Sequence, residues 1–159
     1  MLPLFLAESV AGETVVLIGE EARHAASVVR LRIGERIRVS DGESQSVEGI
    51  VFSVAKSRVE IEVKSRCSIV PFQLKVTVAQ ALAKGDSSST AVALLTEVGV
   101  DEILPWIAHR SIAKWGGEKI VKGRERWEAV ARESTKQSRR IASPKQGTLQ
   151  PIADLFARV

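Results

Sequence analysis

The strand, helix and strand pattern in the middle of the sequence constrains the fold of this chain more than any other feature. The run QLKVTVAQAL at 73–82 is typical of a strand, and DEILPWI at 101–107 is typical of a second one. Between them lies a helical segment, for which Asp86 or Ser87 supplies an N-cap and Gly99 the residue after its end. Elements in this order form a βαβ unit with parallel strands. The second part of the chain is therefore predicted to contain a parallel sheet.

The first 70 residues follow a different pattern, in which short alternations of apolar and polar residues predominate. In RVEIEVKSR, for example, Val59, Ile61 and Val63 lie on one face of a strand and charged residues lie on the other. Short alternating strands of this kind most simply close into a small antiparallel barrel. We expect a buried segment at 1–10, a short helix at 20–31, and strands at 14–19, 35–42, 47–57 and 58–66.

Pro71 interrupts the strand pattern, so the predicted domains are a β-rich one at residues 1–70 and an α/β one at residues 73–159. In the second domain a helix is predicted from about residue 124 to 140, and a short last helix after Pro144. Two parallel strands do not make a stable domain, because such a sheet needs both faces covered. We therefore expect the second domain to be completed by another chain or to be part of a longer protein.

The composition excludes several classes of site. The 159 residues are 45% hydrophobic, enough for a packed core, and they include a single cysteine, Cys67. One cysteine excludes an intrachain disulfide and a four-cysteine metal site, and it suits a reducing cytoplasm. The apolar start meets Glu8 and has no basic region before it, so neither a signal peptide nor a membrane span is expected. Known phosphate-loop, dinucleotide and zinc-protease motifs do not occur, and nothing supports a catalytic triad.

Positive charge is concentrated in one part of the chain. The whole sequence carries +4, whereas residues 110–145 hold eleven basic and four acidic residues, a net charge of +7. Such a segment attracts polyanions in a salt-dependent way, which indicates a nucleic acid as partner. A solvated helix face gives the same pattern, and Glu128, four residues before Arg132, explains part of the charge as ordinary helix stabilisation.

Candidate binding residues stand out within this second half. Lys136, Arg139 and Arg140 lie within five residues at the end of the predicted helix, with no acidic residue four positions away. They are candidates for an RNA-binding cluster, although a helix dipole also favours cations at this end. Lys84, in the connection AKGD, is a further candidate because open α/β sheets usually bind ligands beyond the carboxyl ends of their strands. Trp115 is the tryptophan expected to be exposed and able to stack on a base.

In the first domain, Arg23, His24, Arg30 and Arg32 lie on or directly after the predicted short helix. The arginines could project toward a phosphate backbone, which makes the group a candidate RNA-contacting patch. A histidine on a helix face of mixed character is more often packed or capping than catalytic, so no catalytic role is expected for His24.

Several motifs, in the same order, resemble the RsmE family of ribosomal RNA methyltransferases. They are ARHAASVVRLRIGERIRVSDG, VAQALAKGD, LLTEVGVDEILPW, RSIAKW and RERWEAVARESTKQSRR, followed by Pro144. The resemblance implies a PUA-like barrel for RNA, followed by the first part of a SPOUT-type α/β methyltransferase domain. It also implies N3-methylation of a uridine in 16S rRNA of the small ribosomal subunit, with S-adenosylmethionine bound by a C-terminal knot at a homodimer interface.

The resemblance also implies roles for particular residues. The basic residues of the first domain match the family's H…VLR region, whose role is RNA binding. Gln137, Ser138 and Arg140 match its QS.R stretch, which makes Gln137 and Arg140 the expected catalytic residues. Arg140 would hold a phosphate or a negative charge that develops on the base. The expected RNA-binding residues are Arg23, His24, Arg30, Arg32, Lys84, Lys136 and Arg139.

Two departures from the family pattern bear on activity. SSST follows KGD here, where the family commonly has a charged residue and then Glu, and the family's GPEGG loop and LG.R.LR.ET segment do not occur. Methyl transfer needs the donor carbon and the uridine N3 held close together. We therefore expect the donor site beyond residue 159 and no catalysis by this chain alone. The alternatives are a non-catalytic RNA-binding or ribosome-associated module and one half of a split protein.

Overall fold

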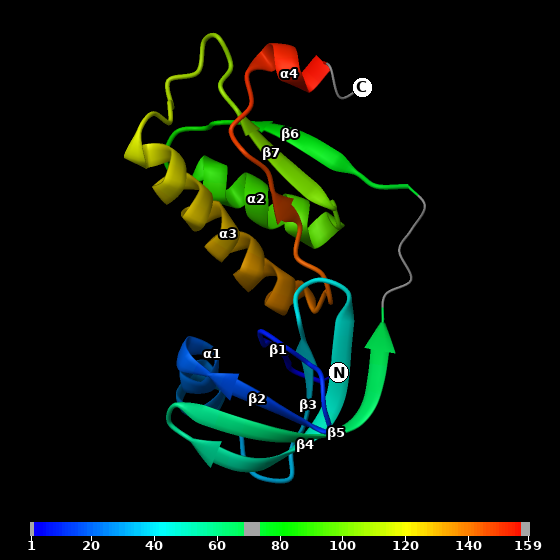
Figure 1. Ribbon diagram of the computed structural model, residues 1–159. Coiled ribbons are helices and arrows are strands. Elements are labelled where there is room, and N and C mark those ends of the chain that lie inside the picture. The colour runs from blue at the N-terminus through cyan, green and yellow to red at the C-terminus, as the bar shows by residue number, and fades with distance from the viewer. Residues whose placement is uncertain (1, 69–73, 157–159) are drawn as a thin grey trace. The chain divides into compact units, whose positions relative to one another are not determined.

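The computed structural model describes residues 2–68 and 74–156, which form two compact units (Figure 1). Unit 1 contains the described residues up to 68 together with Arg139–Ala142, and unit 2 contains residues 74–138 and 143–156. The predicted boundary at Pro71 lies outside the described residues. Each unit is described by itself below.

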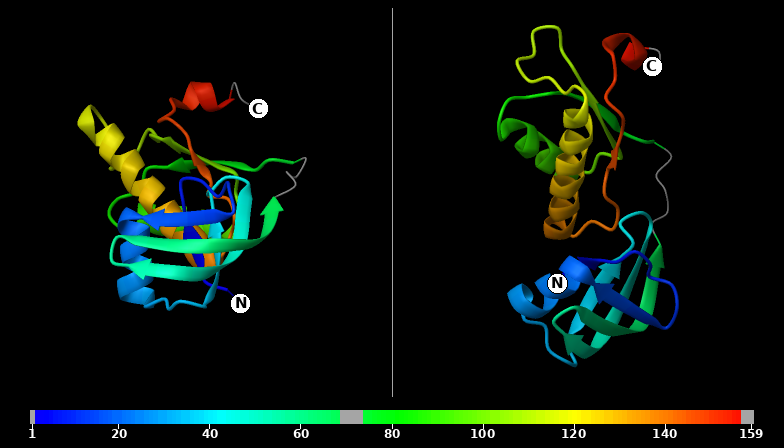
Figure 2. Two further views of the ribbon diagram at one scale, coloured as in Figure 1. Left: turned by 60° about the horizontal axis from the view of Figure 1, so that its bottom comes forward. Right: turned by 60° about the vertical axis from the view of Figure 1, so that its left-hand side comes forward.

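Unit 1 is built on an open five-stranded sheet with the strand order β1-β3-β4-β5-β2. Strand β1 runs parallel to β3, while all the other pairs are antiparallel, and the long β4–β5 hairpin is visible in Figure 2. The prediction of a closed antiparallel barrel is therefore wrong. The chain passes through β2 and a helix between β1 and β3, and a connection of this length permits parallel pairing. The strands are β1 (Leu4–Leu6), β2 (Thr14–Ile18), β3 (Arg36–Ser40), β4 (Gln45–Ala55) and β5 (Arg58–Ser68).

The core of unit 1 follows the alternation of its strands. Ile37 and Val39 of β3 and Ile61 of β5 are fully buried, as their apolar period predicts. The predicted helix is confirmed as α1 (Gly19–Arg23), which continues as the π-helical turn η1 (His24–Val29). Ser40 breaks the alternation, because it is buried although it is polar. Its hydroxyl donates to the carbonyl oxygen of Ile141 at 2.6 Å, which compensates for the burial.

Unit 2 contains the predicted βαβ unit. Its sheet has the order β6-β7-β8, and both strand pairs are parallel. The third strand escapes sequence reasoning because it has only two residues. Helix α2 starts after Asp86 and ends at Gly99, whose φ of 101° confirms the predicted terminus. The elements are β6 (Thr77–Ala81), α2 (Ser87–Val98), β7 (Glu102–Trp106), α3 (Glu118–Ser138), β8 (Lys145–Gln146) and α4 (Ile152–Phe156).

Helix α3 begins six residues earlier than the predicted residue 124. Two adjacent glycines occur just before it, which favours a loop in the sequence. In the structure the carbonyl oxygens of Gly116 and Gly117 accept the first helical bonds, from the amides of Lys119 and Ile120 at 3.2 Å. Helix α3 therefore carries three basic residues, Lys119, Lys122 and Arg124, at or before the predicted start.

The two faces of the second sheet have different surroundings. Helices α2 and α3 lie side by side against one face, where Val92, Ile103, Trp127 and Ala131 form the core (Figures 1 and 2). The other face lines a cavity of about 550 Å³, together with the short helix α4. The α4 side chain of Phe156 is 75% exposed. The second face therefore has far less cover than the first.

Candidate nucleic-acid interface

Three exposed arginines lie together in sequence at the helical segment of unit 1. Arg23 ends α1, and Arg30 and Arg32 follow η1, with all three side chains exposed. Leu31, between the latter two, is buried, and its amide donates to the carbonyl oxygen of Ala25 at 3.0 Å. Because Leu31 anchors the backbone, Arg30 and Arg32 project from a fixed position. Such an arrangement suits contacts with a phosphate backbone.

His24 differs from the neighbouring arginines. Its ring centroid lies 6.1 Å from that of Phe5, and its Nδ1 is buried with no hydrogen-bond partner among the described residues. The side chain is thus half-buried against the core. This geometry favours the packed alternative over a base, and its role as an RNA contact stays a prediction.

Arg36 and Arg38 of β3 are occupied by an acidic partner. Glu48 on β4 accepts a hydrogen bond from Nη2 of Arg38 at 2.5 Å, and Nη2 of Arg36 lies 3.6 Å from the same carboxylate. The hydrogen bond from Arg38 is the main cause that holds the pKa of Glu48 below its ordinary value, and the charges of both arginines act in the same direction. The pairing with Glu48 distinguishes these two arginines from Arg23, Arg30 and Arg32, for which the described part of the chain shows no ion pair.

The Glu48→Gln variant is expected to reduce the stability of unit 1 in a pH-dependent way. Since the folded-state pKa of Glu48 is lowered, its contribution is fully present above the unfolded value of about 4.3 and is lost as the pH falls through the folded-state pKa. Urea midpoints of variant and parent should differ at pH 7, and the difference should be smaller at pH 3. Glu43→Gln, in the exposed β3–β4 turn, serves as control. A difference that is the same at both pH values would contradict this assignment.

The end of α3 differs from its predicted form. Lys136 is 9% exposed, and its Nζ lies 2.7 Å from Oε1 of Glu133, one turn earlier. No acidic residue lies four positions from Lys136, as noted from the sequence, but the pair forms at a spacing of three residues. Its role as an RNA contact stays a prediction. Gln137 is exposed, and the helix ends at Arg139, which is exposed with a φ of 57°. Arg140 follows and is half-buried.

A cavity of about 340 Å³ lies at the N-terminus of α2, next to the predicted candidate Lys84. Lys84 is exposed. The next residue, Gly85, lines the cavity and has a φ of 63°. Three cations of α3 also line it, and none of them was predicted: Lys119, Lys122 and Arg126. Their spacing of three and four residues is the signal that would have revealed them, but only after α3 was known to begin at Glu118.

Trp115 is not the exposed aromatic side chain that was expected. It is half-buried, and its ring lies edge-on to Trp127, with centroids 5.2 Å apart. A Cβ at Gly123 would lie 2.4 Å from the Trp115 ring, so the glycine permits this packing. Trp127 is buried as predicted and donates from Nε1 to the hydroxyl of Ser88 at 2.9 Å. The two tryptophans therefore form a fixed wall of the cavity.

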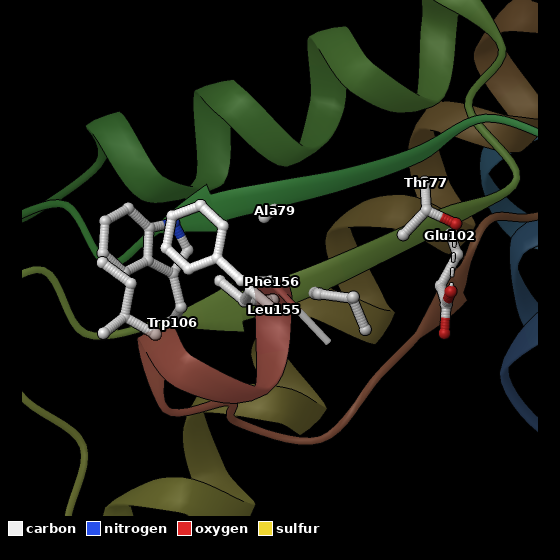
Figure 3. Close-up of a pocket in the computed structure, with 8 residues that line it drawn as sticks. Thr77, Ala79, Glu102, Trp106, Leu155 and Phe156 are labelled. Atoms are coloured by element: carbon white, nitrogen blue, oxygen red, sulfur yellow. Dashed lines mark hydrogen bonds between the residues drawn. The ribbon is translucent and has the colours of Figure 1, made fainter. Parts of the chain in front are cut away.

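The larger cavity, on the second face of the sheet, has a different character. Figure 3 shows Trp106 and Phe156 near one end and the pair Thr77 and Glu102 at the other. The Thr77 hydroxyl donates to Oε2 of Glu102 at 3.1 Å. The lining in between is aliphatic, with Ala79, Leu104, Ile152 and Leu155. The cavity therefore presents a mainly apolar surface.

Neither a metal site nor a membrane-spanning helix is seen in the described residues. Within 2–68 and 74–156, no group of His, Cys, Asp and Glu side chains is arranged to hold a metal ion. In the same ranges, no helix has both the length and the apolar composition required to cross a membrane.

Comparisons with known proteins connect these features to a family. A family model described as an RNA methyltransferase domain matches residues 70–159, and one described as an RNA methyltransferase PUA domain matches residues 17–64. Two curated proteins named ribosomal RNA small subunit methyltransferase E are similar in sequence. The one from Mycobacterium bovis is 39% identical over 133 residues, and the one from Bacillus subtilis is 30% identical over 149 residues.

The similarity to these relatives extends over most of this chain but not over theirs. The matches cover 84% and 92% of this chain and 51% and 57% of the two relatives, so the chain spans about half of their length. A crystal structure of the Neisseria gonorrhoeae protein of the same name, bound to S-adenosyl methionine, superimposes with a TM-score of 0.88 at 25% identity. That match covers 100% of this chain and 66% of the other. The predicted fold class, a PUA-like unit followed by the first part of a SPOUT-type α/β domain, is confirmed except for the closed barrel.

Proposed function

Since the chain belongs to the RsmE family of RNA methyltransferases, we propose that it supplies the RNA-binding part of an enzyme that methylates small-subunit ribosomal RNA from S-adenosylmethionine. The observation that carries the proposal is the match of the methyltransferase-domain model to residues 70–159. The partner would be 16S rRNA or the small ribosomal subunit in the cytoplasm, and the active form a homodimer. The methylated atom, N3 of a uridine, follows from the family resemblance.

The lining of the larger cavity does not fit S-adenosylmethionine. The donor carries a carboxylate, an ammonium group, a sulfonium centre and an adenosine, so its site needs several well-placed polar groups. The larger cavity offers only Thr77 and Glu102, which already bond to each other, among aliphatic and aromatic side chains. We therefore assign donor binding to polypeptide that the relatives have outside the matched part, and no step of methyl transfer to this cavity.

The same cavity has the properties of a packing surface. Parallel sheets are normally covered on both faces, and among the described residues of unit 2 only the helix α4 lies over the second face (Figure 3). The exposed fractions of Ile152 and Phe156, 52% and 75%, leave apolar area that further polypeptide would bury. In this proposal the remaining part of the methyltransferase domain packs against β6 and β7, which completes unit 2.

The basic residues of the chain receive RNA-binding roles in the proposal. Arg23, Arg30 and Arg32 would contact the phosphate backbone through their exposed guanidinium groups. The catalytic roles of Arg140 and Gln137 remain proposals. A guanidinium near the base would stabilise the anion formed when N3 loses its proton, and a carboxamide would orient the base by hydrogen bonds.

One observation favours a second candidate function. Because the lining of the larger cavity does not fit the donor, a non-catalytic RNA-binding or ribosome-associated module is the alternative. It shares the RNA-binding residues with the first proposal and differs in predicting no methyl transfer in any form of the protein.

The test is a methyl-transfer assay with a chimera. Residues 1–159 would be joined to the part of the Mycobacterium bovis relative that lies beyond the match, and incubated with labelled S-adenosylmethionine and unmethylated small subunits. We expect labelled 3-methyluridine on nucleoside analysis, a loss of about 100-fold or more in rate for Arg140→Gln, and no transfer by residues 1–159 alone. Circular dichroism establishes that each form is folded. A folded chimera that transfers no methyl group would favour the second candidate, and label on another nucleoside would contradict the N3 assignment.

A further inference from the structure

The cavity at the N-terminus of α2 lies beside the predicted candidate Lys84 and adds residues of α3 that the sequence did not suggest. It is formed entirely within unit 2, by the connection after β6, the first turn of α2, and one face of α3. Its volume of about 340 Å³ is larger than a phosphate group requires, and it is open to solvent on one side. The residues that line it are Ala83, Gly85, Ser88, Ser89, Trp115, Lys119, Lys122, Gly123, Arg126 and Trp127.

The charge of this cavity comes from helix α3. Lys119, Lys122 and Arg126 line it at intervals of three and four residues, so they occupy one face of the helix. Lys122 lies 3.4 Å from Glu118, and Arg126 lies 3.1 Å from Asp86, but the carboxylates are 90% and 97% exposed. Ion pairs as exposed as these contribute little to stability, so another anion can readily take the place of the carboxylate.

Lys119 has a different status from its two neighbours. It forms no ion pair with any residue in the part of the chain that the structure describes, and its side chain is exposed. The cavity therefore has three cations and two acidic neighbours, with one ammonium group available. An anion that enters the cavity could pair with this ammonium group directly. It could also replace the exposed carboxylates as the partner of the other two cations.

The opposite wall supplies neutral donors. Asp86 caps α2 without a side-chain hydrogen bond, and the first helical bond runs from the amide of Thr90 to the carbonyl oxygen of Asp86. The preceding amides of the first turn have no acceptor within the helix. They carry the positive end of a 12-residue helix dipole.

Ser89 adds a further polar group to the same wall. Its hydroxyl oxygen is shielded from solvent and has no hydrogen-bond partner in the described part of the chain, although Ser89 lines the cavity. A buried hydroxyl without a partner is unfavourable. An oxyanion in the cavity would offer an acceptor once the hydroxyl turns toward it. The Trp127 to Ser88 hydrogen bond holds the helix start against α3, so the wall that carries these donors is fixed.

We propose that this cavity binds a backbone phosphate of the RNA, between the cations of α3 and the first turn of α2. The inference rests on the proposed function, because it names where the RNA strand passes over unit 2. It also gives Lys84 a place, since this exposed residue lies next to the cavity and can contact a neighbouring phosphate.

Lys119→Gln is the most direct test, with Lys75→Gln as the matched control. Lys75 is an exposed lysine of the same unit that does not line the cavity. Binding of a fluorescein-labelled single-stranded RNA would be measured by anisotropy from 50 to 300 mM salt. Loss of one phosphate contact should weaken binding and reduce the salt slope by about one. Lys119→Gln should show this change and Lys75→Gln should not. Equal slopes for the two variants would overturn the proposal.

Asp86→Asn provides a test of opposite sign. Asparagine is also a good N-cap residue, so the helix start is preserved. The change removes the carboxylate that occupies Arg126, and RNA binding should become severalfold tighter. Weaker or unchanged binding would contradict the proposal.

Titration with inorganic phosphate tests binding in the cavity independently of the other RNA-binding residues, and NMR spectra of the amides report it. Amide resonances of Ser87, Ser88 and Ser89 should shift in the parent chain and much less in Lys119→Gln. No shift in the parent would overturn the proposal. If phosphate causes no shifts but the chimera transfers methyl groups, the proposed function holds and the phosphate site does not. If phosphate causes the shifts but the chimera transfers no methyl group, the phosphate site holds and the proposed function does not.

Discussion

The Trp127→Ala variant is expected to lose about 3–5 kcal/mol of unfolding free energy in unit 2. Trp127 is 2% exposed and belongs to the only core cluster formed by the described residues of this unit, with Val92, Ile103 and Ala131. Its removal leaves a large cavity and also deprives Trp115 of its ring contact. The Ser88 hydroxyl would lose its hydrogen bond at the same time. The whole unit should therefore become marginally stable.

Urea unfolding followed by circular dichroism measures this loss, and Trp127→Phe is the matched control. Phenylalanine keeps most of the apolar volume and removes the Nε1 donor, so we expect a clearly smaller loss. If both variants unfold at the same urea concentration as the parent, α3 does not pack on the sheet as described. If Trp127→Ala does not fold, the intermediate loss in Trp127→Phe still reports the contribution of the site.

The second large effect is expected at Gly49 in unit 1. A Cβ there would lie 2.4 Å from the backbone oxygen of Glu62 and from Cγ2 of Ile61. The β4–β5 register shifts between Glu48 and Gly49, so the two strands approach closely at this point. The backbone oxygen cannot move away without disturbing the ladder. We expect Gly49→Ala to cost about 1–3 kcal/mol.

Gly116→Ala is the control for this prediction. Nothing lies within 4 Å of a Cβ at Gly116, and its φ is outside the region that requires glycine. Thermal unfolding should show a lower midpoint for Gly49→Ala and little change for Gly116→Ala. An unchanged midpoint for Gly49→Ala would mean that the strands separate more easily than their register indicates.

The sequence predicted those parts of the fold that depend on local periodicity. The burial of Ile37, Val39 and Ile61 follows from alternation, and the end of α2 follows from Gly99. The open sheet of unit 1 could not be predicted, because the pairing of β1 with β3 joins segments that are far apart in the chain. Strand β8 was missed for a related reason, since two residues carry no period and pair only because β7 offers an edge.

The candidate site was predicted in part. The exposed arginines of unit 1 and Lys84 were found from charge and position, and the structure leaves them at the surface. The burial of Lys136 and its pair with Glu133 were not predicted, because only a spacing of four residues was considered. The cations of the α2 cavity were missed because two glycines concealed the start of α3. A local signal therefore located the charges, and tertiary structure decided which of them face a common cavity.

The measurement that tests the central claim most directly is isothermal titration with S-adenosylmethionine. It compares residues 1–159 with the chimera that carries the remaining part of the Mycobacterium bovis relative. The proposal predicts binding to the chimera and no binding to residues 1–159, since the lining of the larger cavity does not fit the donor. Binding by residues 1–159 alone would show that the donor pocket lies in this chain, which would contradict its assignment to the remaining polypeptide.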